Sequence, residues 1–334
     1  MSTLPKAVLY YHPSSIWSAV ARLAVEEKGY APEEIDFKIV DITKGENYDP
    51  TFLRLNPKAT VPTLVVPLSN TLSEDVDSRY KALTDSTVIV EFLDKSRSSL
   101  SRTHTTSTAP APALTPATIA ATSVAKTIVY DILHSDEASP GRLKFYDARD
   151  DAALKKLKQA VLPVLKGREE ALKRHIADGE SGAVQVSEKT KQFWADKLAW
   201  IQPVARVLEA ADKATESLSE SEKEERAAFF KIAKQGWETD LPNVLAKLTK
   251  EMLGPFALGD QLSIADMHLI AWFTRLVTQA GGTGGDDGKT VVAKIEEYIG
   301  SEHVSRKKLG KLGTFWDAIK GTRSWQKLYG EGVF

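Results

Sequence analysis

Two serines stand at the expected start of a helix near the N-terminus. The segment 11–17 (YHPSSIW) follows a short apolar run and precedes a stretch with helical spacing, so Ser14 and Ser15 fall at the helix start. Backbone amides there lack partners and the helix dipole is positive, so an anion is stabilised. A hydroxyl at the same place can donate to a thiolate and favour its charged form. The alternative is that Ser14 or Ser15 only caps the helix.

The dipeptide Val61-Pro62 precedes a run of mostly β-branched residues at 63–66. An X-Pro bond that enters a strand is a candidate cis peptide, and it would leave the amide and carbonyl of Val61 available to an extended peptide ligand. The alternative is an ordinary trans bond, which most X-Pro bonds adopt.

A third polar group, at 84–87 (TDST), precedes a second expected helix. Its amides again favour an anion, while Asp85 suits an amine and Ser86 suits a carboxylate. The alternative is that Asp85 or Ser86 serves only as the helix cap.

The elements that position these residues follow from periodicity and turn residues. Short apolar or alternating runs predict strands, and apolar residues at three- and four-residue steps predict helices. The predicted order is β-α-β, a loop, then β-β-α. In chain order these elements cover residues 6–11, 16–28, 35–41, 63–66, 80–83 and 87–93.

The remainder of the chain differs in composition. Residues 67–79 are polar and acidic and are expected to form an exposed hairpin or loop. Residues 95–118 are rich in Ser, Thr, Ala and Pro, which indicates a flexible linker, and from about residue 123 the pattern is helical throughout. We therefore predict an α/β domain at 1–95, a linker at 96–122 and an all-α bundle at 123–334. The clearest helical runs are 154–175, 193–208, 224–248 and 265–277.

Composition removes several classes of function. The chain has no cysteine, which excludes disulfides, thiolate-metal sites and a cysteine nucleophile of its own. Its 44 basic and 45 acidic residues nearly balance, so neither nucleic acid nor an anionic membrane is an expected partner. No apolar run approaches the ~20 residues of a membrane span and no secretory signal is evident, so a cytoplasmic location is expected. The six histidines show no metal-ligand spacing, and no metal is expected.

Together, in this order and spacing, the three motifs resemble the glutathione transferase superfamily. The serines before an Ala/Val-rich helix ending in EEKG resemble its serine-type members. The loop KGEN at 44–47, the Val-Pro pair and the Asp85-Ser86 pair stand where the family has equivalents. Residues 262–267 (LSIADM) match its helix-capping motif, and 324–329 (SWQKLY) look fungal. The resemblance implies a thioredoxin-like glutathione-binding domain followed by an all-α bundle.

The resemblance also implies roles for single residues around the thiol of glutathione. Ser15 would stabilise the thiolate, with Ser14 as the alternative. A tyrosine-type site that uses Tyr10 or Tyr11 is a third possibility. Trp17 would line the bottom of the pocket that binds the second substrate. The alternative is that Trp17 only packs against neighbouring helices.

The other implied roles concern the peptide part of glutathione. Val61, ahead of the cis-proline position at Pro62, would pair its backbone with the cysteinyl part. Asp85 and Ser86 would hold the γ-glutamyl end. Two positions near the glycine carboxylate depart from the family. Asn47 stands where many relatives have histidine and Thr60 where they often have Lys or Gln, which leaves Lys44 or Lys58 to compensate.

The implied function is conjugation of glutathione, as co-substrate, to a small hydrophobic electrophile by a detoxifying, serine-type enzyme without a metal. The alternative is a non-enzymatic member that binds hydrophobic ligands or serves as an assembly or regulatory module. The resemblance also implies a homodimer. Its geometry would be altered by the inserted segment at 67–79.

Overall fold

The computed structural model describes residues 6–67, 80–98, 105–303 and 306–332. Contacts divide the chain into two compact units, neither of which is continuous in sequence. Unit 1 comprises Met1–Ile39, Thr60–Ser139 and Leu241–Phe334, and unit 2 comprises Val40–Ala59 and Pro140–Asp240.

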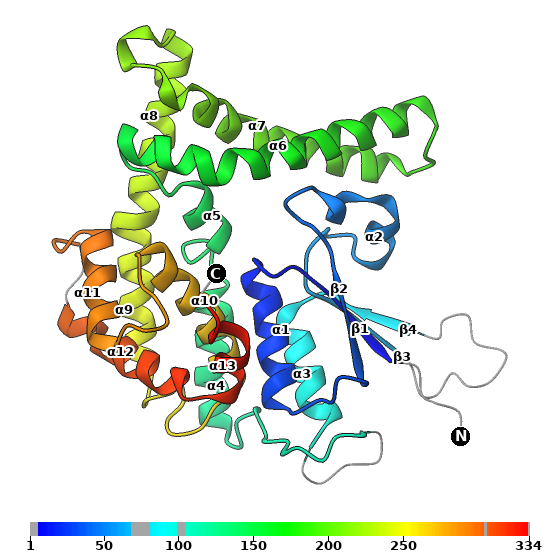
Figure 1. Cartoon of the computed structure of the whole chain (residues 1–334), viewed down its shortest axis with the longest axis vertical. Coiled ribbons are helices and arrows are strands. Elements are labelled where there is room, and N and C mark those ends of the chain that lie inside the picture. Colours follow the sequence, from blue (N-terminus) through cyan, green and yellow to red (C-terminus); the bar gives the residue numbers. More distant parts are fainter. Residues whose placement is uncertain (1–5, 68–79, 99–104, 304–305, 333–334) are drawn as a thin grey trace. The chain divides into compact units, whose positions relative to one another are not determined.

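Unit 1 contains a four-stranded sheet with the strand order β2-β1-β3-β4 (Figure 1). β1 runs parallel to β2 and antiparallel to β3, and β3 runs antiparallel to β4. The central strands β1 and β3 are mostly apolar and bury Leu9 and Leu64, whereas the other residues of β1 are only partly buried. The strands are β1 (Ala7–Tyr11), β2 (Ile35–Ile39), β3 (Thr63–Pro67) and β4 (Tyr80–Leu83).

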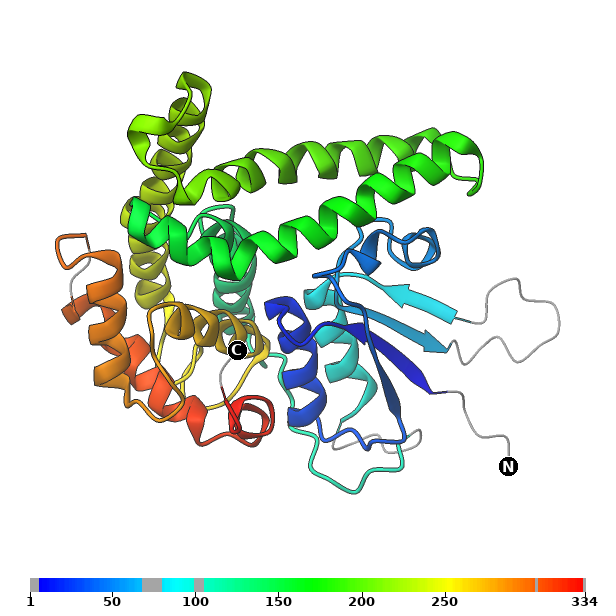
Figure 2. The same cartoon turned by 45° about the horizontal axis from the view of Figure 1, so that its top comes forward.

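Two helices, α1 (Ile16–Glu27) and α3 (Ser86–Ser96), lie side by side against this sheet (Figures 1 and 2). α1 ends before Gly29, whose φ of 64° is the left-handed conformation that glycine adopts after a helix. The predicted order of the four strands and these two helices is therefore confirmed. The loop predicted between β2 and β3 is wrong in part, because it contains the short helices η1 (Glu46–Tyr48) and α2 (Pro50–Leu55). β2 ends two residues earlier than predicted, because the Asp41 side chain turns the chain by accepting from Thr43 N at 3.0 Å.

The other helices of unit 1 form its all-helical part, so the predicted fold class of a thioredoxin-like domain followed by helices is confirmed. The predicted helix at 265–277 is α10, whose buried face includes Met267 and Phe273. These elements are α4 (Ile119–Lys126), the π-helical segment η2 (Thr127–Leu133), α9 (Leu241–Glu251), α10 (Ile264–Gln279), α11 (Gly288–Ile299), α12 (Arg306–Lys320) and α13 (Arg323–Tyr329).

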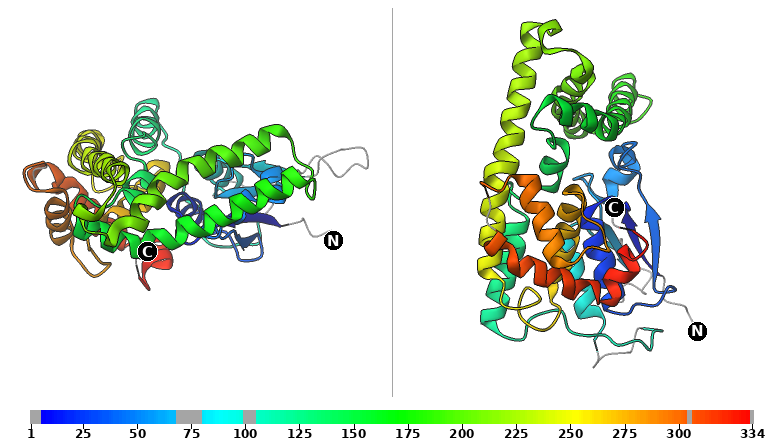
Figure 3. Two further views of the ribbon diagram at one scale, coloured as in Figure 1. Left: turned by 90° about the horizontal axis from the view of Figure 1, so that it is seen from above. Right: turned by 60° about the vertical axis from the view of Figure 1, so that its left-hand side comes forward.

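Unit 2 is dominated by two long helices, α6 (Asp151–Ser181) and α7 (Glu188–Glu209), which pack against each other and connect at Gly182 (Figure 3). Their apolar faces enclose Trp194 and Leu172. The shorter elements are η1 (Glu46–Tyr48), α2 (Pro50–Leu55), α5 (Pro140–Phe145), η3 (Ala210–Asp212), η4 (Thr215–Ser217), α8 (Glu220–Lys234) and the π-helical η5 (Gln235–Asp240).

One predicted helix is interrupted. The run 224–248 was expected to be continuous, but α8 gives way to η5 before α9 begins at Leu241. Pro242 lacks an amide hydrogen and cannot donate to the preceding turn, which explains why the regular hydrogen-bond pattern stops there.

The Ser/Thr/Ala/Pro-rich stretch has fixed contacts that its composition does not reveal. Residues 105–118 form no helix or strand, yet Leu114 is buried within unit 1. The Asp94 carboxylate accepts from Leu114 N and Thr115 N, both at 2.9 Å. The interpretation of 95–118 as a flexible linker therefore needs correction for these anchored residues. Lys28 Nζ also donates to the Pro112 carbonyl at 2.6 Å, and Ile264 N donates to the Leu114 carbonyl at 2.9 Å. Composition missed these anchors because groups outside the stretch supply them.

The predicted boundaries at residues 95 and 122 stay predictions, although helical structure already begins at Ile119. The acidic segment predicted as an exposed hairpin or loop lies, at 68–79, outside the described residues.

Candidate functional site

Ser15 lies at the N-cap of α1, where its extended backbone (φ −87°, ψ 120°) turns the chain into the helix. Its Oγ accepts from Ser18 N at 3.2 Å, so Ser15 does cap the helix. The same oxygen donates to the Val61 carbonyl at 3.4 Å. A bond of that length holds its proton weakly, and a hydroxyl that caps a helix can still donate to a ligand.

Ser14 is oriented differently. Its backbone amide donates to Nδ1 of His12 at 3.2 Å, which makes that nitrogen an acceptor. The Ser14 hydroxyl, 2.8 Å from the same nitrogen, must then be a donor to it. The proton of Ser14 is therefore committed to His12, which favours Ser15 as the donor to a ligand.

The two tyrosines at the end of β1 contact the neighbouring strand β2. The Tyr11 ring packs edge-on against Phe37 with centroids 5.8 Å apart, and the Arg22 guanidinium lies over it at 5.1 Å. The Lys38 ammonium lies 5.8 Å from the Tyr10 ring centre.

The peptide bond Val61-Pro62 is cis, as predicted for this position. The bond between Ser15 and the Val61 carbonyl joins this turn to the start of α1, so two motifs that are 46 residues apart meet in unit 1. Thr60, the residue before this pair, is exposed, and its carbonyl accepts from the Thr63 hydroxyl at 3.2 Å.

The third motif forms the start of α3. Asp85 is the N-cap, and its Oδ1 accepts from Thr87 N at 2.8 Å. Burial raises the pKa of this carboxyl, but the hydrogen bonds from Thr87 and the nearby His134 outweigh it and hold the pKa below its usual value. Ser86 is buried at the first helical position. A charged carboxylate therefore stands at this helix start.

A cluster of aromatic rings that no sequence motif indicated adjoins the first turn of α1. The Trp17 ring stacks on His134, with centroids 4.1 Å apart and an interplanar angle of 22°. His268, from α10, lies 5.4 Å from His134 between ring centres. The histidines are 134 residues apart in the chain, and no motif spacing links them. Trp17 thus packs against other elements yet remains only partly buried.

Both imidazoles of this cluster are held neutral. Burial lowers the pKa of His134, and it lowers the pKa of His268 to about 4. His268 Nδ1 lies 3.0 Å from the Ile264 carbonyl, which can only accept, so Nδ1 carries the proton. Among the described residues, the Nε2 atoms of both histidines are buried without a hydrogen-bond partner.

The burial of His268 predicts a pH-dependent stability. The unfolded pKa is near 6.5 and the folded value about 4, so the unfolded chain takes up the proton first. Stability present above pH 6.5 is lost as the pH falls toward 4, by the order of 3 kcal/mol. In urea unfolding, His268→Phe should remove this part of the acid loss, whereas His303→Asn, at an exposed position, should keep it. Equal acid slopes in wild type and His268→Phe would contradict the expectation.

Asn47 belongs to unit 2, where it is buried in the turn η1. Its Nδ2 donates to the Ala59 carbonyl at 2.8 Å, and its Oδ1 is buried without a partner among the described residues. The side chain thus fastens its own loop, and its predicted role toward a glycine carboxylate stays a prediction.

Neither a metal-binding group nor a membrane-spanning helix is present in the part of the chain that the structure describes. Within those residues no group of three or more His, Cys, Asp or Glu side chains is arranged to hold a metal ion. Of the helices that the structure describes, none combines the length and apolarity needed to cross a membrane.

Comparison with known proteins identifies one domain. Residues 14–96 match the family described as glutathione S-transferase, N-terminal domain. This match contains Ser15, the Val61-Pro62 turn and the Asp85-Ser86 helix start.

Two curated relatives match short parts of the chain. It is 48% identical over 64 residues to the tetrachloro-p-hydroquinone reductive dehalogenase of Sphingobium chlorophenolicum, which is 19% of this chain and 25% of that protein. It is 46% identical over 54 residues to the glutathione S-transferase TCHQD of Arabidopsis thaliana, which is 16% of this chain and 19% of that protein. The chain thus spans a quarter or less of these relatives.

A solved structure shares the fold over a greater length. The beta-etherase of Sphingobium sp. strain SYK-6 aligns with 98% of this chain and 100% of its own, at 15% identity and a TM-score of 0.50.

Proposed function

We propose that this chain, which belongs to the glutathione transferase superfamily through its domain at residues 14–96, conjugates glutathione to a small hydrophobic electrophile. One observation carries the proposal. The Ser15 hydroxyl, at the positive end of α1, reaches the Val61 carbonyl beside the cis bond at 3.4 Å. A hydroxyl donor, free helix-start amides and an edge for an extended peptide therefore converge at one place.

In this reaction the protein has to stabilise the glutathione thiolate and hold the electrophile beside it. Glutathione supplies the nucleophilic sulfur, and the reaction forms a carbon–sulfur bond while the leaving group departs from the electrophile. Ser15 transfers its weak bond from the Val61 carbonyl to the thiolate, and the amides of the first turn add to the stabilisation of the negative charge. The chain has no cysteine, so the thiol reduction that cysteine-type members carry out is not open to it.

Backbone hydrogen bonds and one charged side chain hold the peptide part of glutathione. Val61, preceding Pro62, offers its backbone to the cysteinyl unit, and Thr60 stands next to it in the chain. Asp85 binds the γ-glutamyl amine and Ser86, at the first amide of α3, binds the carboxylate. Asn47 is the remaining proposed contact.

The second substrate is proposed to rest against Trp17. This ring is partly exposed while its other face stacks on the neutral His134, which makes an apolar platform for a flat molecule. The name of the Sphingobium chlorophenolicum relative specifies a chlorinated hydroquinone. A halogenated aromatic ring is therefore the class of electrophile to test first.

Steady-state kinetics with glutathione and a chromogenic chloronitroaromatic tests the proposal. We expect saturable turnover with release of chloride and formation of the glutathione thioether. Absence of turnover with a series of halogenated aromatics, in protein that retains glutathione binding, would overturn the transferase claim.

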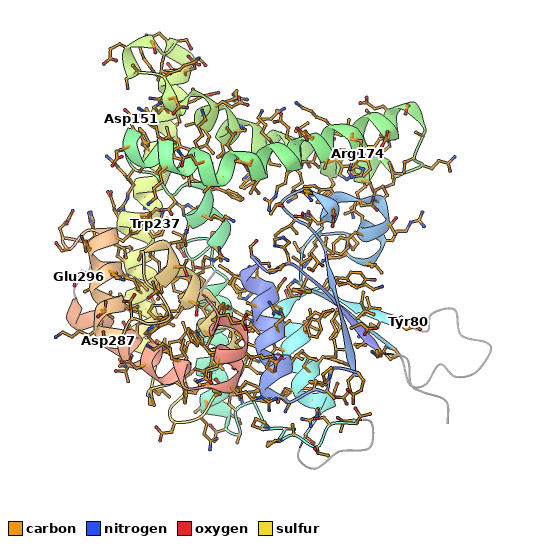
Figure 4. The ribbon with its side chains drawn as sticks, in the orientation of Figure 1. Tyr80, Asp151, Arg174, Trp237, Asp287 and Glu296 are labelled. Carbon is orange, nitrogen blue, oxygen red and sulfur yellow. The ribbon has the colours of Figure 1, made fainter. Side chains whose placement is uncertain are left out.

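Replacing Asp85 tests the γ-glutamyl contact without removing the helix cap, because asparagine caps helices as well as aspartate does. Asp85→Asn should raise the dissociation constant of glutathione by about 10-fold or more, since a charged hydrogen bond to the amine is lost. Asp287→Asn is the matched control (Figure 4), because Asp287 is the N-cap of α11 and accepts from Thr290 N at 2.7 Å. Calorimetric titration with glutathione distinguishes them, and equal affinities in both variants would contradict the contact.

A specific feature favours a second candidate function, that of a non-enzymatic carrier of hydrophobic ligands. A mostly apolar hollow of about 140 Å³ lies in unit 1 between α3, α4 and η2, and Tyr130 and Ile264 are among the residues that line it. The environment-sensitive fluorescence of a bound apolar dye distinguishes the two functions. Dye that is displaced by hydrophobic ligands but not by glutathione, in protein without turnover, would favour the carrier.

The proposal also includes a cytoplasmic, detoxifying homodimer of fungal type, tested by cell fractionation and light scattering. A monomer over the working concentration range would contradict the homodimer.

A further inference from the structure

A guanidinium group from α10 contacts the loop that carries the two serines. The Nη2 atom of Arg275 donates to the Ser14 carbonyl at 2.9 Å, and Ser14 immediately precedes the N-cap Ser15. The helices α1 and α10 pack against each other within unit 1, so the contact is part of a packed interface between two long helices. No feature of the sequence linked residue 275 to the serines.

The charge of Arg275 has no counter-ion among the described residues. Its Nε is buried without a hydrogen-bond partner among them. Burial lowers its pKa, and the interaction with Tyr329 opposes this only in part. Burial of a cation that has no counter-ion is unfavourable, and an anion nearby would offset that cost.

The titratable groups around Arg275 leave the site positive. On α13, burial raises the pKa of Tyr329 to about 12, so this phenol is neutral at neutral pH. Arg22 on α1 adds a second positive charge near Tyr329. His12 accepts hydrogen bonds from Ser14 through Nδ1.

On another side of the α1 start lies one carboxylate. Asp85, at the start of α3, interacts electrostatically with His134, which stacks on Trp17. In the proposed complex, the γ-glutamyl amine of glutathione neutralises the charge of this carboxylate. The groups facing the serine loop from α10, α13 and α1 are therefore cationic or neutral.

We propose that Arg275 is a positioning residue that fixes the Ser14–Ser15 turn and, through its charge, stabilises the thiolate of glutathione held at Ser15. The inference rests on the proposed function, because it needs the thiolate to form there. The guanidinium acts through the Ser14 carbonyl and through space, and it adds to the field of the α1 amides.

The thiolate absorbance of bound glutathione, titrated against pH in the full chain, tests this. Arg275→Gln removes the charge but retains an amide donor, and it should raise the apparent pKa of the bound thiol by about one unit, a tenfold loss of thiolate below both pKa values. Arg275→Lys should restore most of the wild-type titration. Arg275→Gln should bind S-methylglutathione, which has no thiol to ionise, as wild type does, which shows that the site remains folded.

Arg97 provides the matched control. It is also a buried arginine of unit 1 that donates to backbone carbonyls, but it contacts Lys28 at the other end of α1. A helix of 12 residues is about 18 Å long, so the charge of Arg97 acts on the thiolate far more weakly. Arg97→Gln should leave the thiol titration unchanged.

Three outcomes are separable. A lowered thiol pKa in wild type that Arg275→Gln leaves unchanged, while Ser15→Ala raises it, would overturn the role of Arg275 alone. An equal rise in Arg97→Gln and Arg275→Gln would also overturn it, because the effect would not depend on position. Failure of wild type to bind glutathione as a thiolate would overturn the proposed function and this inference together.

Discussion

Ser15→Ala is expected to lower kcat/KM for conjugation by about 10²- to 10³-fold, the loss that follows removal of one preorganised donor to a developing or fixed negative charge. The structure explains why this hydroxyl is available. Its bond to the Val61 carbonyl is long, at 3.4 Å, so a thiolate competes for its proton with little opposition. Glutathione binding should weaken much less than turnover, since the peptide contacts lie elsewhere.

The variant also loses a helix cap, which costs about 1 kcal/mol of stability. Ser187→Ala controls for this, because Ser187 caps α7 and accepts from Thr190 N at 3.2 Å, the same distance as in the Ser15 cap. Ser15→Thr retains hydroxyl and cap and should retain activity. If Ser15→Ala and Ser187→Ala showed equal kinetics, the hydroxyl would have only its capping role, and Ser14 or Tyr11 would become the thiolate donor to test.

Among the variants proposed for this chain, Asp266→Ala is expected to lower the free energy of unfolding most, by the order of 4 kcal/mol. The carboxylate is fully buried in unit 1 and accepts from Ala257 N at 2.7 Å and from Ser263 N and Oγ at 2.8 and 2.7 Å. Alanine would leave two backbone amides in the interior without an acceptor. Urea unfolding followed by circular dichroism measures the loss.

A second capping box supplies the control. Glu222 on α8 accepts from Ser219 N at 2.9 Å, but this box lies on the surface, where water replaces the lost acceptor. Glu222→Ala should therefore change the unfolding midpoint far less than Asp266→Ala. Similar midpoints for the two variants would show that burial of Asp266 does not add to the capping contribution.

The local elements of the N-terminal domain could be predicted because each depends on neighbouring residues. Apolar runs gave the strands, and Gly29 and Asp85 marked helix ends by the conformational freedom of glycine and the capping ability of aspartate. The motif at 262–267 likewise predicted the buried cap at Asp266, because its residues bond to one another over a few positions.

Contacts between distant segments escaped prediction. Arg275 donates to a carbonyl 261 residues away in the chain. His134 and His268 are in contact although 134 residues separate them. Such pairs depend on how helices pack, which is set by the sum of many apolar contacts and not by one motif. Asp94 shows the same limit, since this buried carboxylate is one of several groups that anchor residues whose composition indicates a flexible chain.

The most direct measurement of the central claim is the proton balance of glutathione binding. Titration calorimetry at neutral pH, in two buffers of different ionisation enthalpy, should show that wild-type protein releases a proton when glutathione binds and none when S-methylglutathione binds. Ser15→Ala should bind glutathione with clearly less proton release. Binding without proton release in wild type, or no binding at all, would contradict the account of a thiolate held at Ser15.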